Sequence, residues 1–153
     1  MAETLGSLCD KLTIVKLKQF HTENADRLQS LQEQENSLKD EMNSFLKMAL
    51  SGEIPIDKLC FSANKVFKQE GNEFRSIQHE NIGEVFSELA KINCDLWHEQ
   101  EKVYEFEKVP PAEKDIVVKQ LAILNLKRNQ CIDLIDKKLQ SLIKGKQNVS
   151  RNR

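Results

Sequence analysis

Apolar residues recur at helical spacing through the first third of the chain. Neither Pro nor Gly interrupts the chain between Ser7 and Ser51, and Thr4 can cap the start of a helix. The pattern predicts a long amphipathic helix over residues 4–50, with a bend within residues 21–26 as the alternative. The apolar positions that follow the repeat are Leu5, Leu8, Leu12, Val15, Phe20, Leu28, Leu31, Leu38, Met42, Phe45 and Ala49.

An unbroken helix over this segment would be about 70 Å long at ~1.5 Å per residue. It could not bury its apolar side alone and would need an antiparallel partner or a second subunit. We expect residues 28–50 to project as an arm, covered by the segment 56–80 or by a second copy of the chain. The excess of apolar positions on this arm is the basis for predicting a homodimer.

Gly52 and Pro55 end the first helical segment, and two further helical segments follow them. Residues 56–69 show the repeat of a short helix, and residues 81–107 show that of a long one. The polar stretch between them fits either a loop or the first turns of the next helix.

The consecutive prolines Pro110 and Pro111 stop the segment 81–107, and Pro111 can open the last helix. This helix is predicted to end at about Lys144, just before Gly145. Residues 145–153 are basic and polar, and we expect them to form a disordered tail.

The predicted fold is therefore all-α. It is an elongated helical bundle of three principal helices plus a short helix, with a long helical arm. Residues 4–144 form the single domain, the arm spans about residues 26–80, and the tail spans 145–153. The acidic segment 81–107 lies between two basic ones, which favours packing of opposite charges against each other.

The composition fits one domain of slender helices. Of the 153 residues, 39% are hydrophobic and 31% are charged, and the formal net charge of −1 gives no overall attraction to nucleic acid. No stretch approaches the ~20 apolar residues that span a bilayer, and residues 1–10 lack the pattern of a signal peptide. The four cysteines form no C-x-x-C pair, which favours free thiols in a reducing cytoplasm. They are Cys9, Cys60, Cys94 and Cys131.

Polar residues stand inside the apolar stripes of all three long segments. They are Lys11 and Lys18 in the first, Asn93 and Gln100 in the second, and Asn125 and Arg128 in the third. An unpaired polar group in a core costs roughly 1–3 kcal/mol, so we expect these side chains to find partners or to bind something.

Two interpretations of this set remain open. In the first, it is an internal network in which Arg128 and Lys18 pair with Glu107, Glu101 or Asp10. In the second, it is a pocket in which Lys11, Lys18 and Arg128 hold a phosphate or a carboxylate beside Trp97 as an apolar wall. The candidate binding residues are Asp10, Lys11, Lys18, Asn93, Trp97, Glu101, Glu107, Asn125 and Arg128.

Three motifs carry a resemblance to a known family. Residues 6–18 read G-x-L-x-D-K-L-T-I-x-x-x-K, residues 93–97 read N-x-x-L-W, and residues 125–128 read N-x-x-R. Together they resemble a bacterial helical family of unknown function, whose members are often encoded near, or fused to, cell-envelope glycosyltransferases. Related sequences have Glu-Asp where this chain has Gln100-Glu101, so the resemblance implies no catalytic carboxylate pair here.

Signatures of catalysis and of metal binding are missing from the sequence. The three histidines are scattered without H-E-x-x-H, and neither G-x-S-x-G nor a glycine-rich phosphate loop occurs. The acidic residues of the segment 81–107 fit a solvated face better than a magnesium site. We therefore predict a non-catalytic interaction or scaffold protein without cofactor or metal, linked by the resemblance to envelope polysaccharide assembly. The alternative is a protein that binds, or acts on, a nucleotide sugar or phosphosugar.

Overall fold

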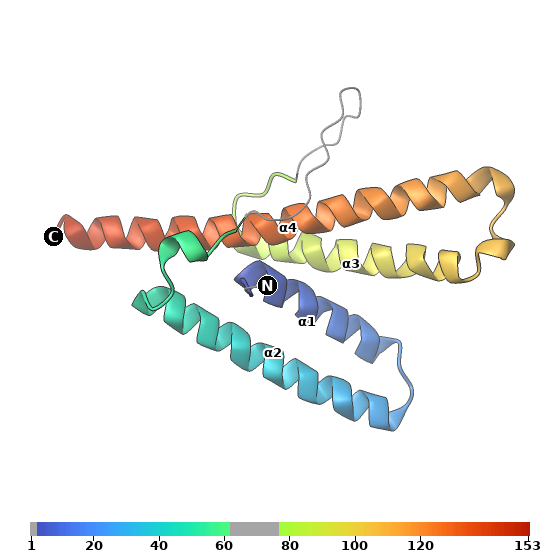
Figure 1. The fold of residues 1–153 in the computed structure, drawn as a ribbon, viewed down its shortest axis with the longest axis horizontal. Coiled ribbons are helices and arrows are strands. Elements are labelled where there is room, and N and C mark those ends of the chain that lie inside the picture. The colour runs from blue at the N-terminus through green and yellow to red at the C-terminus, as the bar shows by residue number, and fades with distance from the viewer. Residues whose placement is uncertain (1–2, 62–76) are drawn as a thin grey trace.

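The computed structural model describes residues 3–61 and 77–153, and within them it contains helices and no strand. The four α-helices are α1 (Leu5–Phe20), α2 (Ala25–Ser51), α3 (Ile82–Tyr104) and α4 (Pro111–Arg151) (Figure 1). Two short 3₁₀ turns, η1 (Ile56–Lys58) and η2 (Phe106–Lys108), follow α2 and α3. The predicted fold class, an all-α helical bundle, is confirmed.

The helices begin where the sequence places capping residues. Thr4 accepts a hydrogen bond from the backbone N–H of Ser7, and Asn81 accepts one from that of Glu84. Pro111 occupies the first turn of α4, where its missing N–H costs no hydrogen bond.

The long helix predicted over residues 4–50 is in fact two helices. His21 ends α1, and the side chain of Asn24 caps α2 by accepting from the backbone N–H of Arg27. The chain turns between them and α2 runs back along α1 (Figure 1). The antiparallel partner of α2 is therefore α1, from the same predicted segment. Most of the segment 56–80 lies outside the described residues, and cover by a second copy stays a prediction. Within α2, Leu31 and Ala49 are buried.

The end predicted for the last helix at Lys144 is also wrong, because α4 continues through Gly145 to Arg151. A helix-ending glycine takes a positive φ angle. In the described part of the chain that conformation belongs to Gly52, at the end of α2, with φ of 84°. Gly145 keeps helical backbone, and the segment predicted as a disordered tail is the last part of α4.

Of the short helix predicted over residues 56–69, the structure describes the turn η1 and the residues up to Phe61. Leu59 is completely buried there and belongs to the core. The rest of that segment, and most of the ambiguous stretch before α3, lie outside the described residues.

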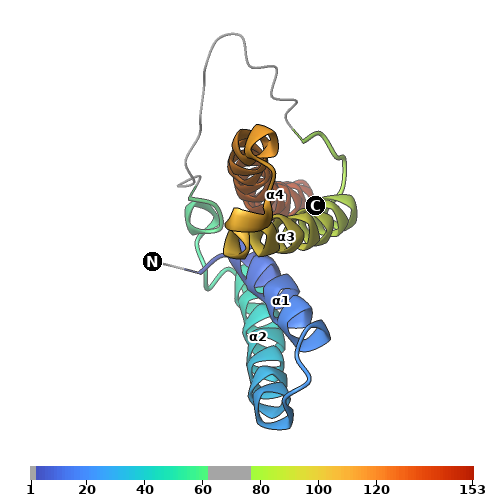
Figure 2. The ribbon, with the colours of Figure 1, turned by 90° about the vertical axis from the view of Figure 1, so that its right-hand side faces the viewer.

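The molecule consists of two helical hairpins, α1–α2 and α3–α4, which diverge from each other (Figures 1 and 2). The core lies where the first half of α1 meets α3 and α4, and it also takes in Ala49 of α2 and Leu59. None of the described helices combines the length and the apolar composition that crossing a bilayer requires.

Candidate functional site

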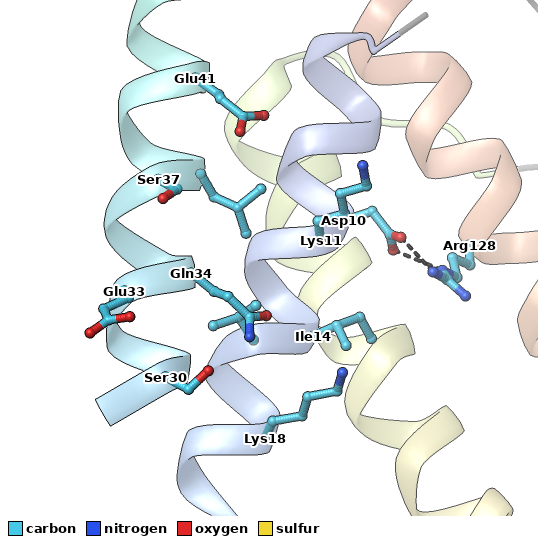
Figure 3. A pocket seen from close by; sticks show the side chains of 12 residues that line it. Asp10, Lys11, Ile14, Lys18, Ser30, Glu33, Gln34, Ser37, Glu41 and Arg128 are labelled. Atoms are coloured by element: carbon cyan, nitrogen blue, oxygen red, sulfur yellow. Dashed lines mark hydrogen bonds and ion pairs between the residues drawn. The ribbon is translucent and has the colours of Figure 1, made fainter. Parts of the chain in front are cut away.

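Asp10 joins three helices through its carboxylate. Its side chain is buried on α1 and accepts two hydrogen bonds from the guanidinium of Arg128 on α4, one of them from Nε at 2.8 Å (Figure 3). The amide Nδ2 of Asn93 on α3 donates to the same carboxylate, to Oδ1, at 2.9 Å. A planar guanidinium matches a carboxylate in this paired geometry, which gives a strong and directional contact.

Asn93 is held in one orientation by a second hydrogen bond. Its Nδ2 also donates to Oγ1 of Thr13 at 2.7 Å, and Thr13 in turn donates to the backbone carbonyl of Asp10. The amide nitrogen must therefore face α1, because an amide oxygen in its place would meet the Asp10 carboxylate. The opposite atom, Oδ1 of Asn93, is buried and has no hydrogen-bond partner among the described residues.

The guanidinium of Arg128 stays protonated. The hydrogen bond to Asp10 raises the pKa of Arg128 above its ordinary value, and this effect outweighs the cost of partial burial. Asp10, Asn93 and Arg128, three of the nine candidate residues, therefore meet in one largely dry junction. Of the acidic partners predicted for Arg128, the structure selects Asp10.

Lys11 and Lys18 lie beside this junction but not in it. Lys11 forms an ion pair with Glu3, whereas Lys18 is half-buried and has no ion pair within the described part of the chain. Both lysines line a groove of about 520 Å³ that also includes Asp10 and Arg128. Figure 3 shows this groove crossing α1, with α2 on one side and Arg128 on the other.

Trp97 and Glu101 belong to a separate surface cluster on α3. The indole of Trp97 stacks on the ring of His21 with centroids 4.8 Å apart, and its Nε1 donates to Glu101 at 2.9 Å. Trp97 does not line the groove of Lys18 and Arg128, so it is not the apolar wall predicted for an anion pocket there.

Glu107 and Asn125 are both exposed, the first in η2 and the second on α4. Neither has a hydrogen bond or ion pair to the junction in the described part of the chain. Glu107 is spaced from Asn93, and Asn125 from Arg128, as residues on one helical face would be. The structure nevertheless leaves both outside the junction.

Asp136 is a buried carboxyl outside the set of candidate residues. Its Oδ1 accepts a hydrogen bond from the backbone N–H of Gly6 at 2.7 Å, in the first turn of α1. Burial raises the pKa of Asp136 from its ordinary 3.8 to about 6, although hydrogen bonds from Gly6 and Thr4 act in the opposite direction. Asp136 thus satisfies an N–H group that α1 itself cannot satisfy.

Gly6 permits this contact because α1 and α4 approach closely there. A Cβ atom on Gly6 would lie 2.3 Å from the backbone carbonyl oxygen of Ile132. The glycine and the Asp10 of the opening motif are therefore explained by the packing of α1 on α4.

Glu35 is a second buried carboxyl outside the candidate set. It accepts hydrogen bonds from Lys39, Gln19 and Lys16, which lower its pKa from 4.5 to about 2. Its hydrogen bonds with Lys16 and Gln19 connect α2 to the second half of α1.

In residues 3–61 and 77–153, no three His, Cys, Asp or Glu side chains gather in a way that could hold a metal ion. Cys9 and Cys131 are buried, and burial raises the pKa of both thiols to about 12. Such thiols are poor nucleophiles at neutral pH. Comparison of the chain with protein-family models, curated proteins and solved structures gives no match.

Proposed function

We propose that this chain is a non-catalytic helical interaction protein. The observation that carries the proposal is that the buried polar side chains hydrogen-bond to one another. The Asp10 carboxylate occupies donors of both Arg128 and Asn93, so their first role is to fix the register of three helices. A network in which an acid, a base and an amide bond mainly to one another supports a framework better than a reaction centre.

A surface for a partner is available at the end of α1. Phe20 leaves 84% of its surface exposed, and its ring contacts His21, which stacks on Trp97. Exposed clusters of aromatic side chains are typical of protein interfaces, where Trp and Tyr often dominate the binding energy. We define this patch, Phe20, His21, Trp97 and His98, as the aromatic end of α1.

The partner that we propose comes from the motif resemblance: a glycosyltransferase, or another enzyme of envelope polysaccharide assembly, in the cytoplasm of a bacterium. The residues that match the motifs, among them Gly6, Asp10, Asn93 and Arg128, hold the helices together. They would therefore act by presenting the aromatic end of α1 rather than by touching the partner.

Site-specific photo-crosslinking tests this proposal. A photoreactive phenylalanine analogue at position 20 should give a discrete adduct in cells. The same analogue at Val149, an exposed position at the far end of α4, should not. The captured protein is then purified, and its affinity for the wild-type chain is compared with that for Phe20→Ser, which should bind at least about tenfold more weakly. Equal adducts at both positions, or equal affinities, would contradict the proposal.

A further inference from the structure

The groove that crosses α1 contains cationic donors that the Asp10 carboxylate does not occupy. A guanidinium has five N–H donors, and Arg128 spends two of its donor atoms, Nε and Nη2, on Asp10. Both oxygens of Asp10 are taken, since Oδ1 also accepts from Asn93. The remaining donors of Arg128 therefore find no acceptor on Asp10.

Lys18 adds a second cation to the same groove. Its ammonium carries three donors and is half-buried, and it has no hydrogen bond or ion pair in the described part of the chain. Figure 3 shows Arg128 beside α1, at the end of the groove opposite α2, and the Lys18 ammonium directed towards that end. This end is therefore built to accept an oxyanion.

The other residues that line the groove restrict the charge and the functional groups of a ligand. Asp10, Glu33 and Glu41 balance Lys11, Lys18 and Arg128, so a dianion such as phosphate is disfavoured and a single negative charge is preferred. On the α2 side, Ser30, Gln34 and Ser37 offer hydroxyl and amide groups (Figure 3). Such groups bond well to hydroxyls of a ligand.

We propose that this groove binds a small hydroxylated organic carboxylate. Its carboxylate lies between Lys18 and Arg128, and its hydroxyls face Ser30, Gln34 and Ser37. The groove volume of about 520 Å³ lies within the range of small-molecule sites in proteins. This site is independent of the aromatic end of α1 and does not require the interaction role proposed above.

The test is a titration of the ¹⁵N-labelled full chain, followed by the shifts of its backbone amide signals. The probe is D-gluconate, and its uncharged counterpart sorbitol is the control, both at constant ionic strength. Gluconate should shift signals of residues 11–18 and 30–41 saturably, and sorbitol should not. Lys18→Gln should weaken gluconate binding about tenfold or more, because it removes a charge-assisted contact. Lys119→Gln, an exposed change on α4 outside the groove, should leave the affinity unchanged.

A second variant, Ser37→Tyr, fills the groove while keeping every charge, and it should abolish the gluconate shifts. The amide spectrum of each variant also shows whether it is folded. Three results would each overturn the proposal: no saturable shift with gluconate, equal shifts with sorbitol, or undiminished gluconate binding by folded Lys18→Gln.

Discussion

Asp10 is the residue on which the buried polar network depends, because it receives hydrogen bonds from both α3 and α4. Removing one member of a buried ion pair leaves the other charged and unpaired. Arg128→Met should therefore lower the free energy of unfolding by about 1–3 kcal/mol, with the lower end favoured because a third of the Arg128 side chain reaches solvent.

Asp10→Ala should cost more than Arg128→Met, since it also deprives Asn93 of an acceptor. Urea denaturation of both single variants and of the double variant measures the coupling between the two residues. Additive losses in that cycle would show that the contact contributes nothing to stability.

The two buried carboxyls outside this network give opposite dependences on pH. The pKa of Asp136 is higher in the folded chain, so the fold binds this proton more tightly and loses stability as pH rises from about 4 to about 6. The pKa of Glu35 is lower in the folded chain, so stability is lost as pH falls from 4.5 towards 2. Together they predict greatest stability between about pH 4 and pH 5.

Melting temperatures recorded across pH 2–8 check this prediction. In Asp136→Asn the melting temperature should fall less steeply as pH rises above 4. In Glu35→Gln it should fall less steeply as pH drops below 4.5. The asparagine can still accept the Gly6 hydrogen bond, so this variant should be as stable at pH 7 as wild type, or more so. If the melting temperature of either variant depends on pH as that of wild type does, the carboxyl removed in that variant does not cause the loss of stability.

The sequence predicted part of this chemistry because helical spacing places side chains on a common face. It brought Asp10, Asn93 and Arg128 into one set, and the structure joins them. It could not choose among Asp10, Glu101 and Glu107 as the partner of Arg128, since that depends on how far α1 is displaced along α4. The stacking of His21 on Trp97 was beyond prediction, because it depends on a turn that the sequence left open.

Among the helices, α1 is the one whose docking requires a glycine. Because a Cβ on Gly6 would meet the backbone of α4, Gly6→Ala should force the helices apart and cost about 1–3 kcal/mol. Gly145→Ala is the matched control, since nothing lies within 4 Å of a Cβ placed there. It should stabilise α4 by up to about 1 kcal/mol. Thermal unfolding of the two variants should shift in opposite directions, and a stable Gly6→Ala variant would contradict the close approach.

The starts of α1 and α4 could be predicted from Thr4 and Pro111, because the chemistry of helix starts is local. The turn between α1 and α2 is harder to predict because neither Pro nor Gly marks it, and a capping residue such as Asn24 is a weaker signal. Gly145 led to the opposite error, because it predicted a helix end where none occurs. A glycine permits a helix to end but does not compel it, and α4 continues there.

The whole molecule is a pair of hairpins with part of its apolar surface uncovered. Part of the stripe on α2 that suggested a homodimer packs against the core, including the partly buried Met42 and Phe45. Other apolar side chains remain outside, among them Phe20, Ile116 and Leu142. The homodimer therefore stays a prediction, and sedimentation velocity at micromolar concentration checks it. A pure monomer there would remove it, whereas Phe20→Ser and Leu142→Ser would locate the interface if a dimer forms.

The position of α1 has a consequence for how the molecule opens. α1 contacts each of the other three helices, whereas the main helical neighbour of α2 is α1 itself. An element held chiefly by one neighbour is released when that neighbour leaves. In native-state hydrogen exchange, the amides of α2 should therefore never be protected more strongly than those of α1, and the first 51 residues should open as one cooperative unit while α3 and α4 stay paired.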